Sequence, residues 1–151
     1  MTAVVTALIL AGTADAAVNA TLTRSESSLL AVMNQARTAH GLRPLRADGR
    51  LEVAARRHSR RMLRTGTFAH GAFTARIRRT GVRAPRVGEN LAWSSGALAQ
   101  ARVIVQMWLA SPSHRANLLR PGYRMVGVGA ITGCFNGQRH TLMVTTDFAG
   151  R

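Results

Sequence analysis

The sequence contains no lysine and few acidic residues, and both absences determine its electrostatics. All 21 of its basic residues are arginines, and the formal net charge is +15. Such a charge predicts attraction to polyanions such as nucleic acid, anionic cell-wall polymers or acidic lipid headgroups. The alternative is a solvated basic surface without a dedicated partner. The six acidic residues are Asp15, Glu26, Asp48, Glu52, Glu89 and Asp147.

Cysteine and aromatic residues are also scarce. The single cysteine, Cys134, excludes an intramolecular disulfide and a cysteine-based metal site, so the fold must rest on its core. Outside the cell Cys134 could link two chains, but we otherwise expect a monomer. Trp93 and Trp108 suit core positions, which argues against a base-stacking platform and sequence-specific binding of nucleic acid.

A long hydrophobic run is missing as well. The apolar run over residues 3–12 is too short to cross a bilayer, so we expect no membrane span in the mature chain. Residues 1–20 resemble a signal peptide, with a small-residue cleavage site at Ala14–Ala16. The basic residues that usually begin such a segment are absent, because the first arginine is Arg24. Either the true start lies upstream or the segment is not a signal; we expect export and a secreted, extracellular protein.

The remaining chain, residues 22–151, has the length of one domain. Thr23 and Glu26 form a capping-box pattern before a first helix that should end at Gly41. Asp48 can cap a second helix that should end at Gly66. Residues 67–96 are expected to be irregular apart from a short helix near 74–79. Further helices are predicted over residues 97–110 and from Pro112 onward, with Ser111 as the N-cap.

In the last thirty residues, the spacing of apolar residues changes from that of a helix to that of a strand. The segments 123–131 and 140–148 have the composition of strands, and Asn136-Gly137 between them is a strong hairpin signal. Helices followed by an antiparallel hairpin predict an α+β fold with helices packed on a small sheet.

The second helix is expected to have two different faces. Its apolar stripe contains Leu51, Ala54, Ala55, His58 and Met62. Its other face carries Arg56, Arg57, Arg60, Arg61 and Arg64. Arginines four residues apart repel each other, so this face either meets an anion or, more commonly, is simply solvated.

Three chemically reactive residues lie beside residues that constrain the backbone. They are His70, Glu89 and His114, next to Gly71, Gly88 and Pro112 respectively. Two imidazoles and a carboxylate could bind Zn²⁺ or a similar divalent cation with an open position, or act as base and acid in hydrolysis. The alternatives are that Glu89 neutralises an arginine and that His114 only packs. No residue can be assigned as catalytic from the sequence; these three are the candidates.

Four further segments carry a recognisable pattern: FAH (68–70), GENLAW (88–93), WLASPSHRANLL (108–119) and the closing MVGVGA…TTDF. Together they resemble the bacterial branch of the CAP superfamily, which includes cysteine-rich secretory, antigen-five and pathogenesis-related proteins. The resemblance runs from about Leu29 to Phe148. It implies a three-layer α-β-α sandwich with a small, mostly antiparallel sheet between helices, usually in an exported protein.

The resemblance also implies a cleft lined by two His and two Glu that can hold a divalent cation. Carried over, these are His70, His114 and Glu89; the second Glu would fall near Ser111, where this chain has no acid. We therefore expect a ligand-binding cleft of His70, Glu89, His114 and Ser111, with the first three as metal ligands. His58 is expected to be packed and hydrogen-bonded, Asp147 to pair with an arginine, and His40 and His140 to lie on the surface.

These features predict first a secreted binding module for a divalent cation, a lipid or another small ligand. A metal-dependent or His/Glu-dependent hydrolase of the cell envelope is the alternative. A third possibility is a basic protein that binds anionic polymers of the cell envelope, with a steep dependence on salt.

Overall fold

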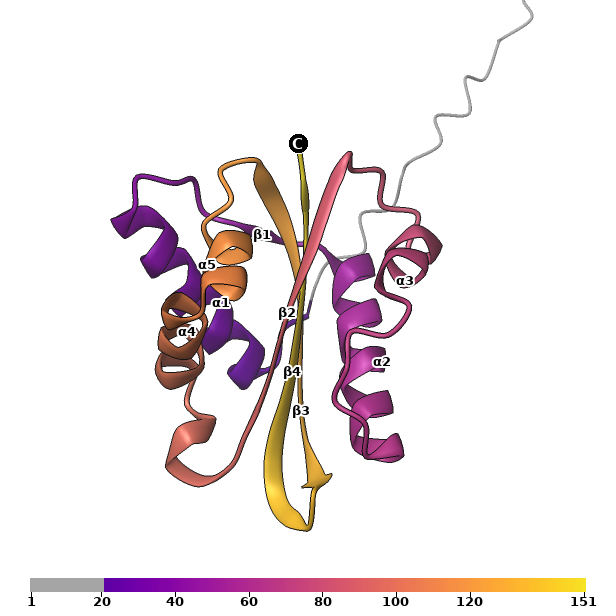
Figure 1. Ribbon diagram of the computed structural model, residues 1–151. Helices are drawn as coiled ribbons and strands as arrows, with labels where there is room; N and C mark the ends of the chain where they lie inside the picture. Colours follow the sequence, from indigo (N-terminus) through magenta and orange to yellow (C-terminus); the bar gives the residue numbers. More distant parts are fainter. Residues whose placement is uncertain (1–20) are drawn as a thin grey trace, which may run out of the picture.

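Helices on both sides of a four-stranded sheet form three layers (Figure 1). This computed structural model describes residues 21–151, so the predicted signal segment and Asp15 lie outside the described residues. The helices are α1 (Arg24–Ala39), α2 (Gly49–Thr65), α3 (Phe73–Arg79), α4 (Ala101–Ala110) and α5 (Pro112–Leu118). The strands are β1 (Arg46–Ala47), β2 (Arg86–Ser94), β3 (Tyr123–Phe135) and β4 (Gln138–Gly150).

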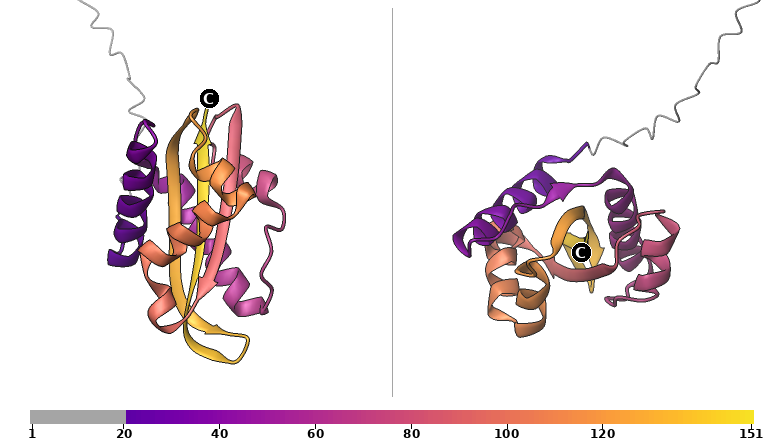
Figure 2. Two further views of the ribbon diagram at one scale, coloured as in Figure 1. Left: turned by 60° about the vertical axis from the view of Figure 1, so that its left-hand side comes forward. Right: turned by 90° about the horizontal axis from the view of Figure 1, so that it is seen from above.

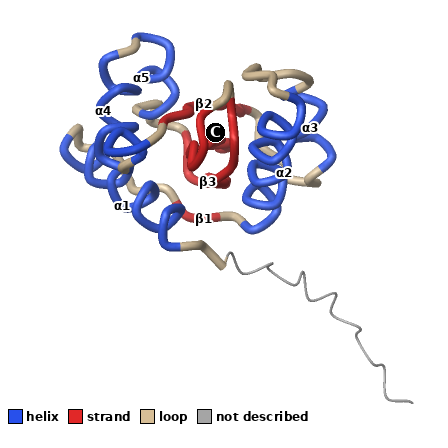
Figure 3. The backbone as a smooth tube through the Cα atoms, turned by 90° about the horizontal axis from the view of Figure 1, so that it is seen from below, coloured by secondary structure: helices blue, strands red, loops and turns tan. Residues whose placement is uncertain are grey.

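The helices divide unequally between the two faces of the sheet. Helices α1, α4 and α5 cover one face and α2 and α3 cover the other (Figures 1 and 2). The strand order is β1-β3-β4-β2; β1 pairs with β3 in parallel and the other pairs are antiparallel. The view along the strands shows the same layers (Figure 3). The predicted α-β-α sandwich with a mostly antiparallel sheet is confirmed.

The first two helices were predicted correctly from local sequence signals. Thr23 and Glu26 form the capping box in both directions, and α1 ends at Ala39, close to the expected stop. The Asp48 carboxylate accepts hydrogen bonds from the first backbone N–H groups of α2, and Gly66 closes the helix in the left-handed conformation. Asn136 and Gly137 both have positive φ, as the predicted hairpin turn requires.

The prediction that residues 67–96 are mostly irregular was wrong, because they contain the nine-residue strand β2. Its sequence, RVGENLAWS, mixes Gly, Glu and Asn with apolar residues and does not alternate, so it carries no pattern of a half-buried strand. Helix α4 begins later than expected because residues Gly96–Ala99 form a 3₁₀ turn. The parallel strand β1 is only two residues long, too short to leave a sequence signal.

Two contacts hold the helical layers close to the sheet. On one face, the Trp108 indole N–H of α4 donates to the Leu91 carbonyl of β2 at 3.0 Å. On the other face, Gly127 and Gly129 of β3 leave room for the backbone of α2, which passes where a Cβ atom would stand. This close approach holds α2, with His58 and its arginines, directly against the strands. Within residues 21–151, no helix is long and apolar enough to cross a membrane.

Candidate functional site

Glu89 lies at the centre of a buried polar group. Strand β2 directs its side chain toward α2 and α3, where it is 2 % exposed. The His70 Nδ1 atom lies 2.6 Å from Glu89 Oε1, and the Arg76 guanidinium donates to Glu89 Oε2. His58 Nε2 is 3.9 Å from the same Oε2 and hydrogen-bonds the Ala69 carbonyl oxygen. Glu89 is therefore both a counterion of an arginine and a partner of a histidine.

Asp147 completes this group from the neighbouring strand. It stands opposite Glu89 in the register of β2 and β4, and it is fully buried. The Arg76 guanidinium also donates to Asp147 Oδ1 at 3.3 Å, as expected from the sequence for an Asp147–arginine pair. Among the described residues, Asp147 Oδ2 and Arg76 Nε have no hydrogen-bond partner. One guanidinium thus serves two buried carboxyl groups.

Burial dominates the protonation of this group. It raises the pKa of Glu89 to about 7 although the Arg76 charge opposes the shift. It raises the pKa of Asp147 to about 8, where the neighbouring Glu89 adds to the effect. The pKa of His58 falls to about 4, because burial and then the Arg76 charge disfavour the imidazolium. Near neutral pH the acidic pair retains protons, and His58 is neutral.

The side chains of His114 and Ser111 contact each other at the start of α5. Pro112 occupies the first helical turn as predicted, but the predicted capping bond of Ser111 is absent. Its hydroxyl is instead 2.9 Å from His114 Nδ1. The side chain of Asn90 donates to the His114 carbonyl oxygen at 2.9 Å, which ties α5 to β2. Burial, followed by the charge of His70, lowers the pKa of His114.

The expected metal ligands do not fit a divalent cation as they lie. Both Glu89 oxygens are already engaged, one by His70 and one by Arg76, and the guanidinium charge repels a second cation. His114 Nδ1 is engaged by Ser111. In the described part of the chain, no group of three or more His, Cys, Asp or Glu residues is placed to hold a metal ion.

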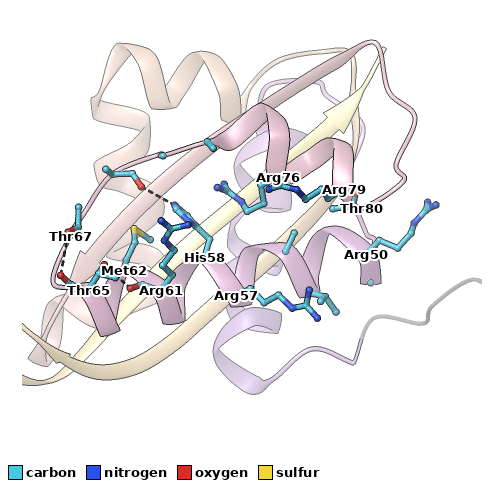
Figure 4. A pocket seen from close by; sticks show the side chains of 16 residues that line it. Arg50, Arg57, His58, Arg61, Met62, Thr65, Thr67, Arg76, Arg79 and Thr80 are labelled. Carbon is cyan, nitrogen blue, oxygen red and sulfur yellow. Dashed lines mark hydrogen bonds between the residues drawn. The ribbon is translucent and has the colours of Figure 1, made fainter.

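A pocket of about 690 Å³ lies beside this group, between α2, α3 and the loop that joins them (Figure 4). His58 and Arg76 belong to both the pocket lining and the Glu89 group. The four residues of the predicted cleft, His70, Glu89, His114 and Ser111, do not line it. Its arginines are Arg50, Arg57, Arg61, Arg76 and Arg79. Its apolar lining residues are Val53, Ala54, Met62, Ala69 and Ala72.

Sequence reasoning missed the role of two arginines. Nothing in the composition of α3 distinguishes Arg76 from Arg78 and Arg79; only the fold shows which one turns inward. Arg56 was grouped with the outer face of α2, but its guanidinium pairs with Glu26 and with Glu52. Helical spacing could have indicated this, since Arg56 follows Glu52 by four residues.

Comparison with known families gives the identity of the fold. A family model described as "CAP: Cysteine-rich secretory protein family" matches residues 30–148. The chain belongs to the CAP family. The matched residues include the GENLAW and WLASPSHRANLL segments, from which the resemblance to this family was inferred.

Two proteins with similar sequences come from Bacillus subtilis. The uncharacterised protein YkwD is 29% identical over 111 residues, which cover 70% of this chain and 42% of YkwD. The uncharacterised membrane protein YlbC is 32% identical over 112 residues, which cover 71% of this chain and 32% of YlbC. The matched region therefore spans less than half the length of either relative.

Solved structures show the same CAP fold. An extracellular protein with an SCP domain from Bacillus anthracis superposes with a TM-score of 0.70 and 26% identity, covering 84% of this chain and 40% of that one. An outer surface protein of Borrelia burgdorferi gives a TM-score of 0.69 at 21% identity, covering 82% and 90%. The second likeness concerns the fold alone.

Proposed function

We propose that this CAP domain is a binding module whose ligand site is the pocket between α2 and α3, and that its ligand is anionic. The observation that carries the proposal is the lining: five arginines and no acidic residue surround the cavity. Guanidinium groups bind carboxylates and phosphates through paired hydrogen bonds, which suits them to recognise such ligands.

The acidic residues of the described chain are already engaged elsewhere. Glu26 and Glu52 pair with Arg56, Asp48 pairs with Arg50, and Glu89 and Asp147 pair with Arg76. Within residues 21–151, no ion pair neutralises Arg57, Arg61 or Arg79, all of which face the pocket (Figure 4). These three charges are therefore available to a ligand.

We also propose that the domain acts outside the cytoplasm. The similar Bacillus anthracis protein is described as extracellular and the Borrelia burgdorferi protein as an outer surface protein. The apolar segment at residues 1–20 agrees with export. A lipid-like ligand with an acidic headgroup also agrees with the mixed arginine and apolar lining of the pocket.

Isothermal titration of tripolyphosphate tests the ligand site. We expect saturable one-to-one binding that weakens at least about tenfold in the double variant Arg57→Gln/Arg61→Gln, because two charge-assisted contacts are lost. The matched control is Arg102→Gln/Arg139→Gln, which removes the same charge from α4 and the hairpin and should bind as the wild type does. Equal binding by the pocket variant would overturn the proposal.

A second candidate function is hydrolysis, and one contact favours it. Glu89 holds the Nδ1 side of the His70 ring, and the His70 side chain is 58% exposed. The other ring nitrogen, Nε2, is then the atom that would act as an oriented general base. If the domain hydrolyses esters or peptidoglycan, Glu89→Gln should reduce turnover about 10²–10⁴-fold. A wild-type domain without turnover on these substrates contradicts this candidate and leaves the binding proposal untouched.

A further inference from the structure

We infer that the pocket is part of a longer basic strip and that its ligand is a linear phosphodiester polymer of the cell envelope. The basic strip consists of Arg57, Arg60, Arg61 and Arg64 of α2 together with Arg79 of α3 across the pocket. This inference rests on the proposed anionic ligand of the pocket and extends it to a ligand class.

The positive charge of the molecule is concentrated in one layer of the sandwich. Residues 50–83 contain ten of the 21 arginines and a single acid, Glu52. Glu52 is buried and held by Arg56, so it offers no compensation at the surface. On the opposite face of the sheet, α1, α4 and α5 together carry four arginines and one acid, Glu26.

The strip continues past the rim of the pocket. Arg60 and Arg64 follow the pocket residues Arg57 and Arg61 by three positions, which places them on the neighbouring part of the α2 surface. Both are exposed, and neither lines the pocket. Arginines four residues apart stand about 6 Å apart along a helix axis. The α2 face thus presents positive charge at regular intervals.

A single small anion does not account for this distribution. It would fill the cavity beside Arg57 and Arg61 and leave Arg60 and Arg64, four residues apart on α2, to repel each other. An extended chain with one phosphate per repeat reaches charges inside and outside the pocket. The apolar lining, including Val53 and Met62, then contacts the carbon skeleton between phosphates.

The lining favours an envelope polymer over nucleic acid. Non-specific binding of single strands relies on aromatic side chains on which bases stack. No Trp, Tyr or Phe lines the pocket. Phe73 of α3 packs instead against the Arg76 guanidinium, with 5.6 Å between the ring centroid and the carbon of that group. A ligand without bases fits this surface better.

The test compares binding of chains of different length to three variants. The probes are tripolyphosphate, poly(glycerol phosphate) of about 30 repeats and an oligothymidylate with a similar number of phosphates. The variants are the pocket variant Arg57→Gln/Arg61→Gln, the flank variant Arg60→Gln/Arg64→Gln and the control Arg102→Gln/Arg139→Gln. Affinity for each probe is measured by titration at several salt concentrations.

We expect poly(glycerol phosphate) to bind at least about tenfold more tightly than tripolyphosphate, because it engages more arginines. The flank variant should lose this advantage and lower the slope of log affinity against log salt by about 1 to 2, while its tripolyphosphate binding stays normal. The control variant should behave as the wild type does.

Three results would overturn the inference. The first is a flank variant that binds the polymer as tightly as the wild type does. The second is a control variant that loses as much affinity as the flank variant. The third is oligothymidylate binding as tight as that of poly(glycerol phosphate). A failure of the proposed pocket is recognised separately, since it appears as unchanged tripolyphosphate binding in the pocket variant.

Discussion

At the scale of single residues, Arg76 links the two halves of the candidate site. It donates to two buried carboxyl groups and to the His70 carbonyl oxygen, and it also lines the pocket. A change in the protonation of the acidic pair therefore acts directly on a pocket residue. The sequence predicted that Glu89 and His70 belong to one site, but it gave no reason to place a guanidinium between Glu89 and Asp147.

Replacing Arg76 with methionine should destabilise the domain strongly at alkaline pH. Two buried carboxyl groups would lose the arginine that they share, and breaking a buried ion pair on one side costs about 3–5 kcal/mol. At pH 5 the cost should be smaller, because both carboxyl groups already hold protons in the wild type. Urea unfolding at pH 5 and pH 8 measures the difference.

The control for this substitution is Arg79→Met on the same helix. Arg79 is exposed and has no acidic partner in the described chain, so its loss should change the free energy of unfolding by less than about 0.5 kcal/mol. An Arg76→Met variant that is as stable as this control at pH 8 contradicts the central role of Arg76.

The wild-type domain should lose stability as the pH rises from about 6.5 to 8. The pKa values of Glu89 and Asp147 are raised to about 7 and about 8, so the folded state holds more protons than the unfolded state in this range. The free energy of unfolding therefore falls as these protons leave. His58, with its pKa lowered to about 4, acts in the opposite direction below about pH 6.5 and flattens the curve there.

Two variants check the origin of this pH dependence by urea unfolding. Asp147→Asn should flatten the loss between pH 6.5 and 8, since one of the two titrating groups is gone. Asp48→Asn should leave it unchanged, because the pKa of Asp48 is lowered and Asp48 is already ionised there. Identical curves for wild type and Asp147→Asn would show that another group controls the transition.

At the scale of elements, the local signals explain why the helices were predictable and β2 was not. A capping box, an Asp N-cap and an Asn-Gly turn act within a few residues, so they mark α1, α2 and the β3–β4 hairpin from sequence alone. Strand β2 owes its conformation to pairing with β4 along its whole length, a contact about fifty residues away in the chain. Its buried Glu89 and Asn90 belong to the site and weaken the usual pattern of a strand.

Gly127→Ala should test how closely α2 packs on the sheet. A Cβ atom at this position would fall on the backbone carbonyl group of Leu51, so either the helix or the strand must move. Overpacking of this kind costs about 1–3 kcal/mol or more. Thermal unfolding should show a lowered midpoint, whereas Thr132→Ala at an exposed position of β3 should stay near the wild type. A Gly127→Ala protein as stable as Thr132→Ala would mean that the layers separate easily.

At the scale of the whole molecule, the positive charge is distributed unevenly between the two helical layers. The five described acids are engaged by three arginines and two histidines, and six arginines without an ion pair among the described residues lie on α2 and α3. The net charge and the arginine face of α2 were evident from sequence, and so were His70 and Glu89. The pocket was not, because its walls come from α2, the 67–72 loop and α3, and only their packing brings the arginines to one cavity.

The most direct test of the account is a map of chemical-shift changes in a ¹⁵N-labelled domain titrated with tripolyphosphate. The account predicts that the largest changes fall in α2, the loop 67–72 and α3, including the side-chain N–H groups of Arg57 and Arg61. It predicts small changes at Arg102 on α4 and at Arg139 on the hairpin. Changes centred on α4 and α5, or spread evenly over the arginines of both helical layers, would contradict a specific anion site between α2 and α3.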